Sequence, residues 1–158
     1  MVVMLIVLVA LGTIAGLTVI SVQGGSTQVS AQRFSAMALY AAESGAAAAM
    51  DWLRARYGQG NGFTAALHEA QPPAGIPGNG VRPGQPGNLL SDDQQGWYEV
   101  TLRNNAGDPG KGNADTDAII IIQVTGHGPN GAMRQLAWEV HKEDATSPLT
   151  LVGWRDVF

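Results

Sequence analysis

Residues 1–22 read MVVMLIVLVALGTIAGLTVISV, and this stretch contains no charged side chain. About 20 consecutive apolar residues are enough for a helix to cross the hydrocarbon core of a bilayer. Gly12 and Gly16 stand four residues apart, a spacing that lets two helices approach each other closely in lipid. We therefore predict that residues 1–25 form the membrane-spanning and assembly half of a long helix.

The helical pattern continues through residues 26–57, which are rich in alanine. Apolar residues recur there at spacings of three, four or seven, as they do on one side of an amphipathic helix. At about 1.5 Å per residue, one helix over residues 1–57 would be roughly 85 Å long, so its second half must pack against something outside the bilayer. We predict that a sheet covers a stripe made of Phe34, Met37, Ala41, Ala48, Trp52 and Tyr57.

The composition limits the classes of partner. The chain has 158 residues, a formal net charge of -4 and no cysteine. Because it contains no run of Lys or Arg, we expect no nucleic acid partner, and because it contains no cysteine it forms no disulfide. The first basic residue is Arg33, although a membrane anchor usually begins with a positively charged flank. We therefore expect that a leader or further residues preceded Met1, and a true start at Met1 with its orientation set by other means is the alternative.

Residues 58–96 contain most of the prolines and many glycines, which sustain neither a long helix nor a central strand. A short helical turn is expected within residues 64–70. Loops of this length in compact domains are usually functional or disordered. We predict a surface loop that faces neighbouring subunits, and a flexible connector is the alternative.

Strand patterns begin at Trp97 and fill residues 97–158. The composition and alternation predict strands at residues 97–103, 118–125, 133–142 and 149–154, the second and third joined as a hairpin. The run Ile119–Ile122 indicates a strand that is central in the sheet or buried on both faces. The predicted fold class is α+β, a long N-terminal α-helix packed against a small antiparallel β-sheet.

Four oxygen-bearing side chains lie close together on the glycine-rich loop between the first two predicted strands. They are Asp108, Asn113, Asp115 and Asp117. Calcium binds such hard oxygen ligands, but the spacing is not that of an EF-hand and no glutamate closes the loop. We keep two interpretations, a calcium-binding loop and a hydrophilic turn rich in Asp and Asn. No other cofactor is expected.

No pattern predicts an enzyme. The three histidines are scattered, and neither a zinc-ligand spacing nor a nucleophile elbow is present. His127 lies in a predicted turn, where we expect it to be exposed. The bulky aromatic residues are expected to pack in the core or on the sheet rather than to bind a ligand; they are Trp97, Trp138, Trp154 and Phe158.

The segment from Phe34 to Ala46, FSAMALYAAESGA, resembles the N-terminal region of PilX-type minor pilins of type IV pili. That family carries an A-x-x-A-A-E-x-G-like stretch, and the residues at the matching places here are Ala38, Ala41, Ala42, Glu43 and Gly45. The resemblance covers about the first 55 residues, and the remainder is similar only in layout. It implies a long helix, a variable loop and a small antiparallel sheet.

The resemblance also implies a function without catalysis. Such a subunit is processed and often N-methylated, is inserted once in the bacterial inner membrane with its domain in the periplasm, and then joins the pilus through its helix. The implied place is the extracellular pilus tip, in a priming complex that initiates assembly and serves adhesion or twitching motility. The implied partners are other minor pilins, the major pilin and a tip adhesin.

The residues expected to make the assembly contacts lie along the helix and are Leu5, Leu8, Gly12, Gly16, Val19, Phe34 and Glu43. The chain departs from the pilin pattern in two respects, because residues 1–32 contain no acidic residue and no disulfide can close the C-terminal region. Two alternatives stay open. One is a pseudopilin of a type II secretion system, and the other is a single-span, membrane-anchored extracytoplasmic binding module, which predicts a basic flank and a flexible linker.

Overall fold

The computed structural model describes residues 2–57, 62–90, 95–110, 112–144 and 146–157, with side chains from Gln28 onward. The elements in chain order are α1 (Val2–Tyr57), α2 (Thr64–Leu67), β1 (Trp97–Asn104), β2 (Ile119–His127), the short 3-10 helix η2 (Pro129–Gly131), β3 (Met133–His141) and β4 (Thr150–Asp156). The chain divides into two units, Met1–Arg33 and Phe34–Phe158. The second unit contains the whole sheet together with the C-terminal part of α1.

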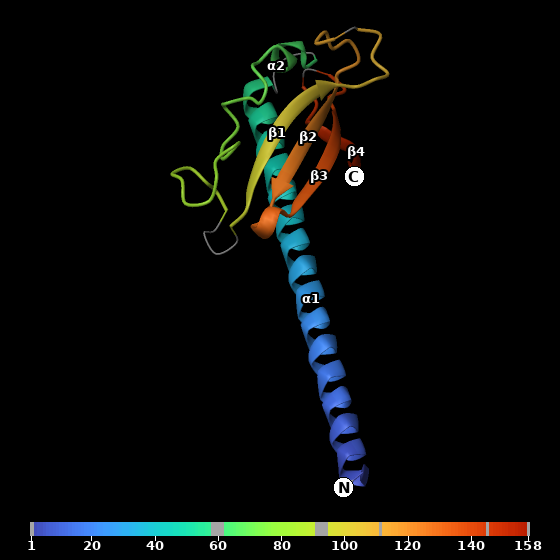
Figure 1. Cartoon of the computed structure of the whole chain (residues 1–158). Helices are drawn as coiled ribbons and strands as arrows, with labels where there is room; N and C mark the ends of the chain where they lie inside the picture. Colours follow the sequence, from blue (N-terminus) through green and yellow to red (C-terminus); the bar gives the residue numbers. More distant parts are fainter. Residues whose placement is uncertain (1, 58–61, 91–94, 111, 145, 158) are drawn as a thin grey trace. The chain divides into compact units, whose positions relative to one another are not determined.

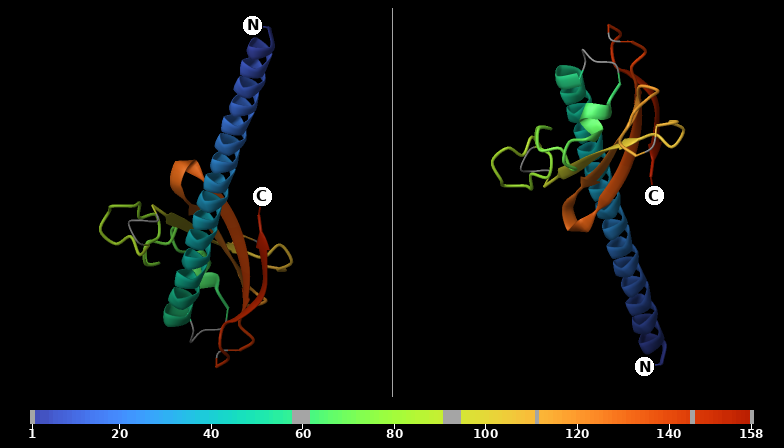
Figure 2. Two further views of the ribbon diagram at one scale, coloured as in Figure 1. Left: turned by 90° about the horizontal axis from the view of Figure 1, so that it is seen from below. Right: turned by 90° about the horizontal axis from the view of Figure 1, so that it is seen from above.

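The four strands form one antiparallel sheet in the order β1-β2-β3-β4. The C-terminal part of α1 lies against one face of this sheet (Figures 1 and 2), which confirms the α+β fold class. β2 lies between β1 and β3, as predicted for a central strand. Ile120 and Ile122 face the helix and are fully buried, whereas Ile119 and Ile121 face outward and are only half-buried, so this strand is not buried on both faces.

Small residues set the distance between α1 and the sheet. A Cβ atom at Gly126 would collide with the carbonyl oxygen of Ala38 and with the backbone nitrogen of Ala42. A Cβ atom at Gly45 would lie 2.7 Å from the ring of Tyr98. Because no side chain fits between them, the helix backbone and β2 are in direct contact at these positions.

The helix buries Ala41 and Trp52 as predicted, but the rest of the face that it presents to the sheet differs from the predicted stripe. Its buried residues are Ala38, Ala41, Ala42, Gly45, Ala46, Ala49, Met50, Trp52 and Leu53. Phe34, Met37 and Ala48, which we predicted to be covered, are only half-buried. The helix is turned so that small side chains meet the sheet at Gly126 of β2 and at Gly128 just after it, where the two backbones approach closely.

The segment before β1 covers the β1 side of the domain. Phe63, Leu67 and Ile76 are buried in the main core. The hydroxyl of Tyr98 donates a hydrogen bond to the carbonyl oxygen of Pro77 at 2.6 Å. This part of the predicted surface loop therefore contributes to the hydrophobic core, and α2 occupies the place of the predicted helical turn.

The predicted membrane-spanning segment lies outside the residues whose side chains are described. Among the described residues, the structure contains no helix that is both long enough and apolar enough to cross a membrane. The membrane-spanning half of the predicted fold is therefore a proposal, and the α+β domain is an observation.

Candidate functional site

The predicted assembly residues fall into two groups. Those in the first half of the helix, namely Leu5, Leu8, Gly12, Gly16 and Val19, lie where side chains are not described. Phe34 is half-buried, and its carbonyl oxygen lies 2.7 Å from where a Cβ atom at Gly128 would stand. Glu43 is exposed. Of the predicted contact residues, Glu43 is thus the described one that is fully available to a partner.

Glu43 lines an apolar groove between α1 and the last two strands. The groove has a volume of about 460 Å³ and is lined by Glu43, Ala47, Leu136, Trp138, Leu151 and Trp154. Glu43 is the only charged residue among them. Of the two predicted places, Trp154 lies on the sheet and not in the core: it is 68 % exposed, because no further strand or helix of the described chain covers β4.

The backbone of β4 is open on its outer side. The amide of Val157 donates to the carbonyl oxygen of Gln135, and the register pairs Arg155 with Ala137 and Trp154 with Trp138. Because hydrogen-bonded and non-hydrogen-bonded pairs alternate in an antiparallel ladder, the N–H and C=O groups of Trp154 point away from β3. Within the described part of the chain, neither a strand nor a loop pairs with this side.

The opposite edge of the sheet is closed. The amide of Val100 donates to Asn79 Oδ1 at 2.8 Å, and the amide of Leu102 donates to Gln71 Oε1 at 2.9 Å. The amide of Gly80 donates to the carbonyl oxygen of Tyr98 at 2.8 Å. Side chains and backbone of the segment before β1 thus occupy the outward groups of that strand.

The acidic loop between β1 and β2 brings three of its four predicted ligands together. One carboxylate oxygen from each of Asp108, Asp115 and Asp117 lies within 4.8 Å of the others. The fourth predicted ligand, Asn113, is exposed. Three carboxylates at such distances could hold a cation, but exposed acidic groups often gather without one.

Donors from the loop itself occupy Asp108. Thr116 donates from its backbone and its hydroxyl, and Gly110 and Asn104 donate as well. Burial by itself would raise the pKa of Asp108, but these four hydrogen bonds outweigh it and lower the pKa to about 2. The carboxylate therefore acts as the acceptor that organises the loop.

Asp115 connects the loop to α2. Its Oδ2 accepts a hydrogen bond from the amide of Phe63, and its own amide donates to Thr64 Oγ1 at 3.0 Å. Its Oδ1 is buried and has no hydrogen-bond partner among the described residues. Burial raises the pKa of Asp115, and the nearby carboxylates of Asp117 and Asp108 act in the same direction. A proton or a cation would relieve this unfavourable charge.

His127 is not exposed as predicted. Its side chain is 17 % exposed, and its ring stacks on Trp97 with centroids 3.8 Å apart and an interplanar angle of 6°. The guanidinium of Arg82 lies over the indole ring of Trp97, 5.3 Å from its centroid. Burial lowers the pKa of His127, although the carboxylate of Glu99 opposes the shift. The stack joins the segment before β1 to the end of β2.

Sequence reasoning missed the groove and the open edge of β4. The signal was present in Thr150–Asp156, where apolar residues continue up to the predicted end of the strand at Trp154. A last strand in a sheet has one unpaired edge unless another segment covers it, so its apolar residues are candidates for contact with a partner.

The fold and the site together define a class, an α+β domain formed by the end of a long helix and an antiparallel sheet with one open edge. No protein-family model, curated protein or solved structure matches the chain. A function therefore has to be argued from the residues themselves.

Proposed function

We propose that this chain is a minor pilin of the PilX type, a structural subunit that joins a type IV pilus through α1. The single observation that carries the proposal is the way the residues of the A-x-x-A-A-E-x-G-like stretch divide on the helix. Ala38, Ala41, Ala42 and Gly45 are buried against the sheet, whereas Glu43 is exposed at the margin of this contact, in the groove beside the last two strands. The stretch thus both seats the domain and leaves a charged position for contact with another subunit.

The continuity of α1 supports the same proposal. One helix, Val2–Tyr57, contains both the uncharged apolar stretch and the residues that pack on the sheet. A binding module held by a separate anchor would be expected to have a flexible linker between the two. A helix that serves as anchor and as part of the domain core suits a subunit that assembles through that helix.

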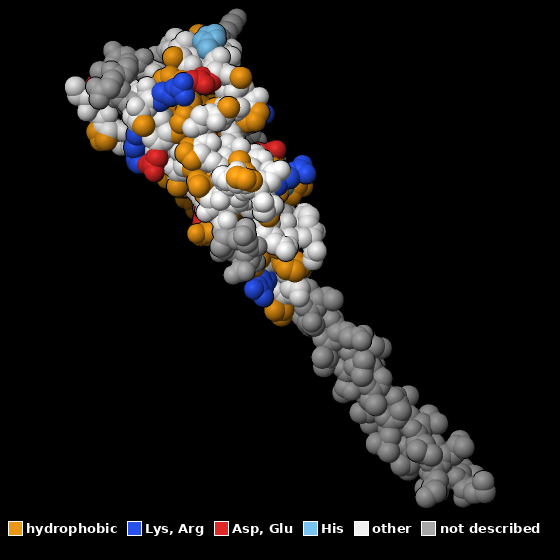
Figure 3. Space-filling view, turned by 90° about the vertical axis from the view of Figure 1, so that its left-hand side faces the viewer, with side chains coloured by type: hydrophobic (Ala, Val, Ile, Leu, Met, Phe, Trp, Pro, Cys, Tyr) orange, Lys and Arg blue, Asp and Glu red, His pale blue; other side chains and the backbone are white. Residues whose placement is uncertain are grey.

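The proposal includes a location and a set of partners. Before assembly the subunit would be held in the bacterial inner membrane by residues 1–25, with its domain in the periplasm. After assembly it would lie in the tip complex of the pilus, with other minor pilins, the major pilin and a tip adhesin as partners. No nucleic acid partner is part of the proposal, since the sequence contains no run of Lys or Arg. On the face that Figure 3 shows, Lys and Arg side chains are scattered over the surface.

A type II secretion pseudopilin is the second candidate, because the same helix and domain would serve in a shorter fibre. The two candidates differ in the fibre that the chain enters. Mechanically sheared pili carry minor pilins, whereas a secretion pseudopilus is tied to export of a substrate. The test must therefore record both fractions.

The experiment is mass spectrometry of the full chain from sheared surface fibres and from the membrane of its own cells. We expect the chain in the fibre fraction, with a processed N-terminus and an N-methylated first residue. The double variant Gly12→Ile/Gly16→Ile should lose fibre entry while staying in the membrane, because it removes the close helix approach. The matched control, Val2→Ile/Val3→Ile, keeps both glycines and should enter fibres normally.

Three results would separate the alternatives. An intact basic N-terminus and a chain confined to the membrane would favour the anchored module. Absence from sheared pili together with a defect in protein export on deletion would favour the pseudopilin. Fibre entry by a chain lacking residues 1–25 would contradict assembly through the helix in either fibre.

A further inference from the structure

Exposed apolar side chains gather on β4. Leu151, Val152 and Trp154 are all substantially exposed, and they belong to one strand of seven residues. Trp154 and Leu151 line the groove next to α1, where Leu136 and Trp138 extend the apolar wall. A patch of this kind marks a contact surface, and tryptophan is the residue most enriched at the energetic centres of interfaces.

The same strand offers unpaired backbone groups. The N–H and C=O groups of Trp154 and Asp156 point away from β3, as the register requires. An extended peptide can use such groups to add a strand to the sheet, and its alternate side chains then enter pockets beside the edge. The groove next to Trp154 is such a pocket.

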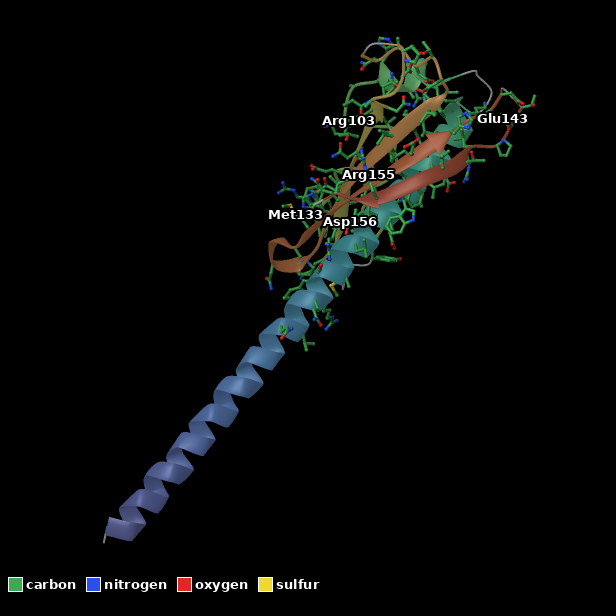
Figure 4. All side chains as sticks on the ribbon, turned by 90° about the vertical axis from the view of Figure 1, so that its right-hand side faces the viewer. Arg103, Met133, Glu143, Arg155 and Asp156 are labelled. Carbon is green, nitrogen blue, oxygen red and sulfur yellow. The ribbon has the colours of Figure 1, made fainter. Side chains whose placement is uncertain are left out.

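The charges beside the edge have opposite signs on its two faces. Glu43 lines the groove on the helix side, and Arg155 lies on the outer face, where Figure 4 labels it. Neither residue forms an ion pair within the described chain, although Glu139 lines the same outer hollow as Arg155. The neighbouring Asp156 is already paired with Arg134 at 3.3 Å.

We propose that the outer edge of β4 binds an extended segment of a partner protein, which becomes a fifth strand of the sheet. The segment carries an apolar and a basic side chain on the face toward α1, to fill the groove at Trp154 and to pair with Glu43. It carries an acidic side chain on the opposite face, next to Arg155. The backbone of Trp154 and Asp156 supplies the hydrogen bonds.

A second copy of the chain fits this site less well than such a partner. Two copies that meet along β4 would bring a carboxylate from each Glu43 to the same side of the joined sheet. Pairing Trp154 of one copy with Asp156 of the other would also place the two Arg155 side chains directly opposite each other. Like charges in these positions are unfavourable, whereas a basic partner strand complements Glu43.

The probe is a displayed library of random ten-residue peptides, screened against the full chain in detergent micelles. We expect enriched peptides to alternate apolar or basic residues with polar or acidic ones and to contain no proline in their centre. In amide hydrogen exchange, the bound peptide should protect Trp154 and Asp156. Trp154→Ala should weaken binding by tenfold or more, since the loss of an interface tryptophan commonly costs about that much.

Charge exchange tests the orientation of the bound strand. Glu43→Lys should weaken binding of the enriched peptide and restore binding of a version in which Glu replaces its basic residue. Arg155→Glu should have the corresponding effect on the acidic position of the peptide. Leu89→Ala is the matched control, because Leu89 is similarly exposed but lies in the segment before β1, at the opposite edge of the sheet.

Enrichment without alternation, or binding that survives Trp154→Ala, would overturn the proposal. So would protection of the β4 amides without peptide together with a dimer in sedimentation velocity, because the occupant would then be a second copy. The inference goes beyond the proposed function and concerns only the described domain. Its failure would leave fibre entry unaffected, and normal peptide binding by a chain that never enters fibres would contradict the proposed function alone.

Discussion

The two edges of the sheet have the same backbone chemistry and opposite surroundings. At β1, Asn79 and Gln71 accept hydrogen bonds from the outward amides, and the segment that carries them packs into the core. At β4, the outward groups of Trp154 meet no other part of the described chain, and the indole is largely exposed. Both edges belong to the one sheet that packs on α1 (Figure 2).

The difference means that the two edges of the sheet are not equally available to a partner protein. A free strand edge invites pairing with other chains, and proteins usually close or shorten it. Here the long proline-rich and glycine-rich segment covers the β1 edge and not the β4 edge. The closed edge protects the fold, and the open edge is where contact with another protein costs the least rearrangement.

The largest expected effect on stability comes from adding a side chain where α1 touches β2, between the two edges of the sheet. Gly126→Val should lower the free energy of unfolding by about 3 kcal/mol, because the new side chain meets the backbone of Ala38 and Ala42. The matched change Gly153→Val, on the open strand, should cost less than about 0.5 kcal/mol, because a Cβ atom there has no atom within 4 Å in the described structure. Denaturant unfolding of the full chain in micelles measures both. Equal losses would show that β4 is as crowded as β2.

The next effect should come from opening the closed edge. Asn79→Ala removes the acceptor for the amide of Val100 and the donor for the carbonyl oxygen of Pro73, and should cost about 2 kcal/mol. The amide of Val100 should then exchange faster. Val152→Thr on the open edge is the control and should change stability by less than about 0.5 kcal/mol. An unchanged exchange rate at Val100 would mean that Asn79 does not close the edge.

The pH dependence of stability tests how the acidic loop between β1 and β2 is held in place. The pKa of Asp108 is about 2 in the folded chain, below its ordinary value of 3.8, so its contribution to stability is present above pH 4 and is lost as the pH falls toward 2. Asp108→Asn should lower the melting temperature at pH 7 and flatten this acid limb. A melting temperature at pH 7 equal to that of the unaltered chain would contradict it.

Asp115 should behave in the opposite way, because its pKa is raised in the folded chain. Protonation then favours folding, so its contribution improves as the pH falls through the folded pKa. Asp115→Asn should raise the melting temperature at pH 7, since it removes charge repulsion with Asp108 and Asp117 and keeps an acceptor for Phe63. A lower melting temperature in circular dichroism would show that the charge itself is needed there.

Calcium should give the smallest effect. The oxygens of Asp108 and Asp117 already accept hydrogen bonds from neighbouring loop groups, which leaves the buried oxygen of Asp115 as the main unused ligand. We expect the melting temperature in millimolar calcium to match that in chelator. A rise that grows with the logarithm of the calcium concentration and disappears in Asp115→Asn would establish a cation site.

The sequence predicted the sheet well, because its strands carry local signals. Alternation at β1, the isoleucine run of β2 and the glycine-rich turn before β3 each identify a strand or a hairpin without knowledge of the rest. The helix was also predicted, but its buried face was predicted only in part, through Ala41 and Trp52. Large apolar residues such as Phe34 and Met37 suggested one stripe, whereas the glycines at 126 and 128 accept only small residues beside them.

The candidate site was predicted only in part for the same reason. Spacing along one loop is local, so the approach of Asp108, Asp115 and Asp117 could be expected. The hydrogen bond between Asp115 and Phe63 joins residues far apart in the chain, and so does the groove that joins Glu43 to Trp154. Contacts of this kind depend on how separate elements are placed, and a single sequence carries no periodic signal for them.

The sequence by itself determined the elements of this protein: an uncharged apolar stretch, an alanine-rich continuation and strands that alternate. Only the tertiary structure decided which edge of the sheet is closed, since Asn79 and Gln71 reach β1 through a fold of the preceding segment. Local patterns arise from the geometry of the backbone, which is the same in every chain. The edge at Trp154 is open because no other described segment covers it, and that depends on how the separate elements pack together.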